Sequence, residues 1–187
     1  MSVALPNESS VTVAVVKRSA KVVMPQNVLF PYDGDPKNVV YTPNLVAQDM
    51  VQWFKPSGRV LDPCKGDGIF LEHLPEGTQW CEITEGVDFF NYWERVDWIM
   101  SNPPYSGFYE WIYHSMKIAD NFVYLLPANK PFISNRLMML LREWGEIKHM
   151  RFYGTGNKLG FPVGFAIAAF HFERGNKNGC TFSYWAA

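Results

Sequence analysis

The chain alternates between apolar strand-like runs and amphipathic helix-like segments from Tyr41 almost to its last residues. Strand-like runs end at Asp62 (GRVLD), Glu82 (TQWCE) and Met100 (VDWIM), and a fourth run, NFVYLL, occupies residues 121–126. This alternation predicts an α/β sandwich with a mostly parallel sheet, because parallel strands need crossover connections. The consecutive runs IKHMRFY and VGFAIAAFHF predict an antiparallel hairpin at one edge of that sheet.

Helices are predicted between these runs from apolar spacing and from capping residues. Thr42 and Pro43 have the residue types of an N-cap and a first helical position. Ser134 is a second predicted N-cap and Gly145 a helix end. A short helix is also expected from Phe70. Three expected apolar faces are Val46, Met50 and Trp53; Phe108, Trp111, Ile112, Met116 and Ala119; and Leu137, Leu140, Leu141 and Trp144.

The length of 187 residues, with 48% hydrophobic residues, suits one compact domain. Residues 1–38 show no clear period apart from VTVAVV at 11–16, so an N-terminal extension (1–38) is expected before a domain at 39–187. The three cysteines lack metal-ligand spacing, and the chain has neither a secretory segment nor a long apolar run. A reduced cytoplasmic protein without a zinc or other metal site and without membrane contact is therefore expected.

The first predicted strand leads into a glycine-containing turn, VLDPCKGDGIF, at residues 60–70. Gly66 and Gly68 permit a sharp turn and a close approach of the backbone to a ligand. Asp62 ends the strand, at the edge where ligands of doubly wound sheets bind. Taken alone, the same pattern also suits a turn that binds no ligand.

Glu82 follows Asp62 by twenty positions, a spacing at which a carboxylate accepts hydrogen bonds from ribose hydroxyls. The turn carries Asp62 and Asp67 and lacks the GK[ST] of a phosphate cradle, which disfavours pyrophosphate. A nucleoside with an amino-acid tail, whose ammonium pairs with Asp62, fits better than NAD or ATP. Asp88 and Phe89 form a pair suited to bind and stack an adenine ring, although Asp88 is equally interpretable as a turn carboxylate.

Asn102-Pro103-Pro104-Tyr105 follows the third predicted strand. The prolines remove two backbone donors and leave carbonyl acceptors. The Asn102 side-chain oxygen and the Pro103 carbonyl can accept both hydrogens of an exocyclic amine, directing its lone pair toward a methyl donor. Tyr105 offers a face for an extruded base. A proline turn after a buried strand is the structural alternative.

Together these residues resemble the class I S-adenosylmethionine-dependent DNA adenine N-6 methyltransferases, in their gamma-like motif order. The resemblance spans roughly residues 39–173 and carries the motifs D-P-x-x-G-x-G-x-F and N-P-P-Y. It implies a Rossmann-like sandwich with a seven-stranded sheet and a reversed last strand. It also implies S-adenosylmethionine contacts from Tyr41, Thr42, Pro43, Asp62, Pro63, Gly66, Gly68, Phe70, Glu82, Ile83, Asp88, Phe89 and Asn102.

By the same resemblance, the loop before the last strand supplies an aromatic to the flipped base, with Phe161 or Phe165 as candidates beside Tyr105. Only about fourteen residues follow the hairpin, so no separate target-recognition domain is expected and recognition falls to loop 154–164, the extension or a partner subunit. Residues 1–100 carry 8 Lys/Arg and 13 Asp/Glu, whereas residues 101–187 carry 9 and 5. The basic half favours a polyanion. The candidate phosphate contacts are Lys130, Arg151 and Lys158.

The function predicted from these motifs is methylation of the adenine amino nitrogen in DNA by a small enzyme of phage or orphan type, acting as a monomer or homodimer. Methylation of a protein glutamine amide or of RNA adenine remains open, because the tetrapeptide grips any planar amine in the same way. A non-catalytic cofactor-binding subunit is a further alternative.

Overall fold

The computed structural model describes residues 40–161 and 164–186, all within one compact unit, Tyr32–Ala187. The extension expected over residues 1–38, with its VTVAVV run, lies outside the described residues. The main elements are α1 (Asn44–Phe54), β1 (Val60–Asp62), β2 (Gln79–Trp80), β3 (Val96–Ser101), α2 (Phe108–Ile118), β4 (Ala119–Pro127), α3 (Asn135–Trp144), β5 (Ile147–Thr155), β6 (Ala166–Glu173) and β7 (Thr181–Tyr184). Short 3-10 helices are η2 (Ile83–Glu85), η3 (Phe89–Asn91), η4 (Lys130–Phe132) and η5 (Gly156–Leu159).

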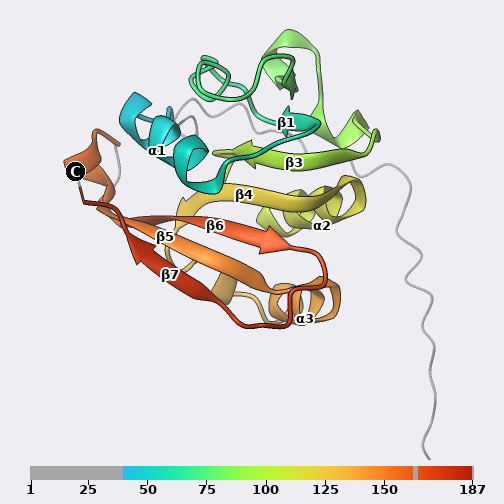
Figure 1. Ribbon diagram of the computed structural model, residues 1–187, viewed down its shortest axis with the longest axis vertical. Helices are drawn as coiled ribbons and strands as arrows, with labels where there is room; N and C mark the ends of the chain where they lie inside the picture. Colours follow the sequence, from blue (N-terminus) through green and yellow to red (C-terminus); the bar gives the residue numbers. More distant parts are fainter. Residues whose placement is uncertain (1–39, 162–163, 187) are drawn as a thin grey trace, which may run out of the picture. The chain divides into compact units, whose positions relative to one another are not determined.

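The strands form one seven-stranded sheet in the order β2-β1-β3-β4-β6-β5-β7 (Figure 1). Strands β1 to β4 pair in parallel, whereas β6 runs antiparallel to both β4 and β5. The predicted mostly parallel sheet with an antiparallel hairpin is therefore confirmed. The reversed strand β6 lies between β4 and β5 rather than at the edge. The edge itself is formed by β7, which adds to β5 in parallel. The four-residue strand β7 falls in the tail in which the sequence pattern predicts no strand.

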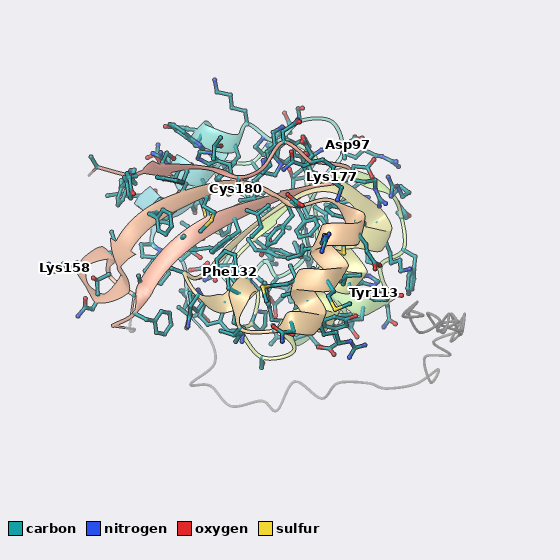
Figure 2. All side chains as sticks on the ribbon, turned by 90° about the horizontal axis from the view of Figure 1, so that it is seen from below. Asp97, Tyr113, Phe132, Lys158, Lys177 and Cys180 are labelled. Atoms are coloured by element: carbon teal, nitrogen blue, oxygen red, sulfur yellow. The ribbon has the colours of Figure 1, made fainter. Side chains whose placement is uncertain are left out.

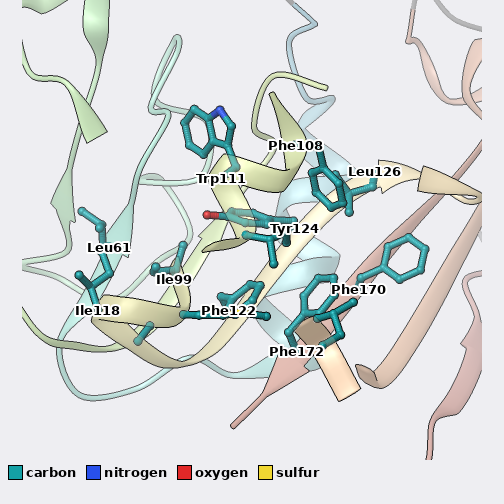
Figure 3. Packing of buried hydrophobic residues seen from close by; sticks show 14 of the residues in the cluster. Leu61, Ile99, Phe108, Trp111, Ile118, Phe122, Tyr124, Leu126, Phe170 and Phe172 are labelled. Carbon is teal, nitrogen blue, oxygen red and sulfur yellow. The ribbon is translucent and has the colours of Figure 1, made fainter. Parts of the chain in front are cut away.

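The core lies on both faces of the central strands because their side chains alternate between the faces. Phe122, Tyr124 and Leu126 of β4 enter a cluster with α2 and α3, while Val123 and Leu125 enter a second cluster with α1. Figure 1 shows the same division, with α1 on one face of the sheet and α2 and α3 on the other. Aromatic rings fill the first cluster, where Phe122 stacks on Phe172 at 4.7 Å (Figure 3).

The predicted helix ends hold for α3. The hydroxyl of Ser134 accepts a hydrogen bond from the Leu137 N–H at 3.3 Å, and Gly145 follows the helix as its C-cap. A side chain at Gly145 would clash with the backbone of Glu173, which explains why glycine ends this helix. Of the predicted apolar face, Leu137 and Leu141 are buried and Leu140 and Trp144 are partly buried.

Four local predictions were wrong. Residues 66–74 form successive turns instead of a helix, since Gly66 and Gly68 have positive φ and Pro75 follows closely. Trp53 is 47% exposed, and Ala47 completes the buried face of α1 in its place. Ala119 begins β4 rather than ending α2. The α1 N-cap is Pro43 without a side-chain bond, so Thr42 does not cap the helix.

Candidate functional site

The carboxyl ends of β1 and β3 lie side by side, because Val60 and Leu61 pair in parallel with Trp98 and Ile99. This arrangement brings the glycine turn after β1 next to the tetrapeptide after β3. The Ser101 hydroxyl donates to Asp62 Oδ1 at 2.7 Å and ties the two segments together. We call this end of the sheet, with the glycine turn and residues 102–105, the site edge.

Asp62 is fully buried, and only one of its carboxylate oxygens is satisfied. Oδ1 accepts from the Cys64 N–H at 3.2 Å and from Ser101, whereas the buried Oδ2 has no partner among the described residues. Burial raises the pKa of Asp62 to about 7, against the hydrogen bonds from Ser101 and Cys64. An unpaired buried carboxylate oxygen is costly, so the residue suits a cationic or hydrogen-bond-donating ligand.

Glu82 connects the glycine turn to the next loop. Its Oε2 accepts from the Gly66 N–H at 2.9 Å, and its Oε1 accepts from the N–H and hydroxyl of Thr84 at 3.1 and 2.7 Å. Burial opposes its ionisation, but the hydrogen bonds from Thr84 and Gly66 outweigh burial and hold the pKa of Glu82 below its usual value. Glu82 is therefore an ionised acceptor that fixes the turn and retains lone pairs for a ribose hydroxyl.

The residues just before α1 close over this turn. A Cβ built on Gly66 would lie 3.9 Å from the ring of Tyr41, and Tyr41 itself is 58% exposed. Gly66 is required there by its φ of 56° rather than by lack of space. Lys65 is not free to bind a phosphate, since its ammonium lies 2.5 Å from Glu85 Oε1 and over the Trp80 ring.

Asn102 presents its amide oxygen without a partner. Its Nδ2 donates to the Val40 carbonyl at 2.9 Å and to the Thr42 hydroxyl oxygen at 3.1 Å, while the buried Oδ1 accepts nothing among the described residues. A backbone carbonyl can only accept, so it must face the NH₂ group and not the oxygen of the amide. The amide oxygen is thereby left for a donor outside the protein. Pro103 is buried and Pro104 half-buried, with no backbone N–H at either position.

Tyr105 and Phe165 meet at this edge, their ring centroids 6.2 Å apart in an edge-on arrangement. The Tyr105 hydroxyl is buried and has no hydrogen-bond partner within residues 40–161 and 164–186, and burial raises its pKa to about 12. Phe165 is 41% exposed. Phe161, the other predicted base-stacking residue, is 3% exposed and packs in the core with residues of α1, so the structure places it away from a base.

Two aromatic residues of the predicted cofactor set belong to the core. Phe70 is 2% exposed, and Phe89 is 3% exposed and stacks on Trp111 at 4.8 Å. Asp88 accepts from the Phe90 N–H at 2.9 Å and caps η3. Ile83, directly after Glu82, is 49% exposed and remains available to a ligand.

The three predicted phosphate contacts differ in availability. Arg151 is buried and paired with Asp49 through two bonds of 2.6 and 2.7 Å, with its guanidinium 3.9 Å from the Trp53 ring, which contradicts the predicted phosphate contact. The ammonium of Lys130, in η4, lies 5.9 Å from the ring of Phe108, which is the first residue of α2. Lys158 is exposed on η5, and Figure 2 shows it on the protruding turn between β5 and β6.

Sequence reasoning missed Ser101 and Arg136 at this edge and gave Thr42 a different role. Ser101 bonds Asp62, Thr42 bonds Asn102, and Arg136 lies 4.0 Å over the Tyr109 ring beside the start of α2. Only Arg136 carried a signal, because a cation in the first turn of a helix opposes the helix dipole and so calls for another reason. The bonds of Ser101 and Thr42 join segments about 40 and 60 positions apart and depend on the sheet register.

A hollow of about 380 Å³ lies at the other end of the strands and is not part of the site edge. It is lined by Arg95, Tyr113, Met116, Lys117, Leu140, Trp144 and Arg174. Arg95 and Arg174 both pair with Asp120, and Arg174 also donates to the Met116 carbonyl near the end of α2. These arginines therefore serve to end the helix.

No metal cluster and no membrane helix was found in the described part of the chain. Within residues 40–161 and 164–186, no three His, Cys, Asp or Glu side chains are grouped to hold a metal ion. No helix in the same ranges is long and apolar enough to span a membrane.

Solved structures with a similar fold include two subunits of type I restriction enzymes and one protein described as a methyltransferase. A modification subunit assigned to a type I restriction enzyme of Vibrio vulnificus aligns with a TM-score of 0.60 at 16% identity, over 83% of this chain and 49% of that one. The M protein of the type I restriction enzyme EcoKI aligns with a TM-score of 0.58 at 13% identity, over 77% and 48%. A protein of Listeria monocytogenes described as a class I S-adenosylmethionine-dependent methyltransferase aligns with a TM-score of 0.54 at 11% identity, over 76% and 64%.

These similarities establish the fold. No family model and no curated protein sequence matches the chain. The described residues have the Rossmann-like α/β fold of class I S-adenosylmethionine-dependent methyltransferases. The chain spans about half the length of the two type I subunits.

Proposed function

We propose that this protein transfers the methyl group of S-adenosylmethionine to the exocyclic amino nitrogen of adenine in DNA. The proposal is carried by two buried atoms that have no hydrogen-bond partner among the described residues, Asn102 Oδ1 and Asp62 Oδ2, at the carboxyl ends of neighbouring strands. One is an acceptor for a substrate amine and the other an acceptor for a cofactor ammonium. The fold of the described residues and the order of the two motifs support the same assignment.

Residues of the glycine turn and its neighbours fit the cofactor. Asp62 would accept from the ammonium, Glu82 from the ribose hydroxyls, and Tyr41 would cover the turn. Pro63, Gly68, Ile83 and Asp88 complete the proposed contacts, with Phe70 and Phe89 supporting them from the core. When bound, S-adenosylmethionine supplies an electrophilic methyl group on a sulfonium.

Asn102 Oδ1 and the Pro103 carbonyl would accept the two hydrogens of the substrate amine. These bonds pull the nitrogen lone pair out of conjugation with the ring and aim it at the methyl group. Positive charge develops on the nitrogen as it attacks, so both acceptors bind the transition state more tightly than the ground state. Tyr105 and Phe165 would enclose the extruded base, and their aromatic faces exclude water from it.

DNA is favoured by the motif order, by the basic second half of the chain and by the fold shared with the two type I subunits. Lys130, Lys158 and Arg136 have no ion-pair partner among the described residues and flank the site edge. Loop 154–164, residues 1–38 or a partner subunit would contribute to sequence recognition.

The test is incubation of the full chain with labelled S-adenosylmethionine and, in parallel, with unmethylated DNA, RNA or a release factor. Mass spectrometry then identifies the methylated nucleoside or residue. The proposal predicts N6-methyladenine in DNA, lost in Asn102→Ala and retained in the surface control Asn178→Ala. Label confined to RNA or to glutamine would replace the proposed substrate. Label on DNA at equal rates in wild type and Asn102→Ala would refute the assigned chemistry.

A further inference from the structure

The residues that precede α1 make direct contact with the tetrapeptide. Thr42 is 7% exposed, and its hydroxyl oxygen accepts from Asn102 Nδ2 at 3.1 Å. The same nitrogen donates to the Val40 carbonyl at 2.9 Å. Thr42 makes no capping bond to α1, whose N-cap is Pro43. Its buried hydroxyl is therefore directed at Asn102 and not at the helix.

An asparagine side chain can turn its NH₂ and its oxygen into each other's place with little change in shape. In the reversed orientation, Asn102 Oδ1 would face the Val40 carbonyl, which can only accept, and the NH₂ would point toward the substrate. The Thr42 hydroxyl can donate or accept, so the Val40 carbonyl selects the orientation and Thr42 holds the amide in it. Oxygen facing a carbonyl at this distance is repulsive, and an NH₂ cannot accept from an amine. Only the observed orientation leaves the acceptor where the reaction needs it.

We infer that Thr42 is a positioning residue: the Val40 carbonyl selects the orientation of the Asn102 amide, and the Thr42 hydroxyl holds the amide there so that Oδ1 faces the substrate amine. The assignment of that substrate amine rests on the proposed function; the locked orientation rests on the two hydrogen bonds. Thr42 acts through Asn102 and does not itself touch the reacting atoms.

Local sequence holds Thr42 in place before any ligand binds. Pro43 restricts the preceding residue to extended backbone, and the β-branched side chain of threonine is stiff at its first torsion. Tyr41, in the same three-residue segment, lies against Gly66 of the cofactor turn. The segment 40–42 thus touches both the glycine turn and the tetrapeptide. Because the Thr42 oxygen accepts from Asn102, the hydroxyl proton of Thr42 remains free to donate elsewhere.

The kinetic test compares Thr42→Val, which keeps the shape but removes the acceptor, with Thr42→Ser, which restores it. At saturating S-adenosylmethionine and DNA, kcat is expected to fall about tenfold in Thr42→Val, the effect of one lost hydrogen bond. Thr42→Ser should stay within about twofold of wild type by the same reasoning. Thr78→Val is the matched control, since its hydroxyl only bonds the Pro75 carbonyl in a distant turn. Unchanged kcat in Thr42→Val, with wild type active, would overturn the inference.

A second readout does not depend on turnover. In protein labelled with ¹⁵N-asparagine, the Asn102 side-chain NH₂ signals, assigned by their loss in Asn102→Ala, should exchange slowly with solvent. One of the two protons should lose protection in Thr42→Val and regain it in Thr42→Ser. Identical protection in all three proteins would refute the positioning role. If the wild type methylates nothing, this measurement still decides the orientation, and only the proposed function fails.

Discussion

The two ends of the parallel strands differ in how many of their polar side chains are paired within the protein. At the amino ends of β3 and β4, Asp120 pairs with both Arg95 and Arg174, and the arginines also bond backbone carbonyls of α2. At the site edge, Asp62, Asn102 and Tyr105 supply three of the five buried polar atoms without a partner among the described residues. Buried groups left unpaired by the protein are the better mark of a ligand site, because a fold normally satisfies them.

A conspicuous cluster of cations beside aromatic rings is thus a poor guide in this molecule. Both arginines that line the hollow of about 380 Å³ are already paired with Asp120. The other two buried atoms without a partner among the described residues are His73 Nε2 and Trp144 Nε1, and of these only Trp144 Nε1 belongs to a residue that lines the hollow. The site edge is distinguished by several orphan atoms from separate segments that converge.

The largest effect is expected for Asn102→Ala. Removing the amide oxygen should lower kcat about 10²- to 10³-fold, as for loss of one preorganised group that stabilises transition-state charge. The dissociation constant for S-adenosylmethionine, measured by calorimetry, should change little because the cofactor groups are untouched. A parallel loss of cofactor affinity would show that Asn102 mainly binds the cofactor. The site edge would then not be divided into cofactor-binding and amine-binding residues.

Asp62 should make cofactor affinity depend on pH. Its pKa of about 7 means that much of the carboxylate is protonated below neutrality, and binding of an ammonium requires the ionised form. Affinity should rise up to tenfold per pH unit below pH 7 and fall again above about pH 8, where an α-amino group loses its proton. Asp62→Asn should bind about 10- to 100-fold more weakly and lose the acidic limb of this profile.

The same carboxyl should change the stability of the ligand-free protein. Its pKa is raised on folding, so its contribution to stability is greatest below about pH 4, the unfolded value, and is lost as pH rises through 7. Asp62→Asn, which carries no charge, should therefore lack this decline between pH 4 and pH 7. Urea titrations at several pH values measure the difference. An identical pH dependence in both proteins would mean that Asp62 has a partner in solution.

A smaller effect is expected for the cations around the site edge. Lys130→Ala or Arg136→Ala should raise the KM for DNA roughly fivefold at low salt and reduce the salt dependence of binding by about one ion each. Lys177→Ala is the control, because Figure 2 shows Lys177 well separated from Lys158 and its ammonium bonds the Arg142 carbonyl. Equal effects from all three variants would indicate nonspecific electrostatic attraction of DNA instead of a defined binding path for it.

The sequence predicts the sheet and the two motifs but not how the polar groups are shared between segments. The alternation of strand-like and helix-like runs predicts the mostly parallel sheet and the hairpin but not the strand order. Asp62 and Asn102 follow from their places at strand ends. Arg151 is an example of what the sequence does not predict. It resembles any basic residue near a strand end, yet it forms an ion pair with Asp49 of α1, which lies 102 positions away in the sequence. Phe89 and Phe161 likewise cannot be assigned to core or ligand until the packing of the sheet is known. Thr42 has the sequence signature of a helix cap, and only the register of β3 reveals its bond to Asn102.

The smallest effect is expected at the opposite end of the strands, with Asp120→Asn. The paired side chains there are 41–49% exposed, and ion pairs of that exposure contribute about 1 kcal/mol or less, with screening by salt. Burial raises the pKa of Asp120, but the hydrogen bonds and charges of Arg95 and Arg174 together outweigh it and hold that pKa below its usual value. This stabilisation should therefore be present at neutral pH and fade below pH 4. Thermal unfolding should show a small loss of Tm at low salt, whereas kcat and the KM for DNA stay unchanged. A large loss of activity in Asp120→Asn would mean that the two ends of the sheet are coupled, and the hollow would then have to be reconsidered as part of the functional machinery.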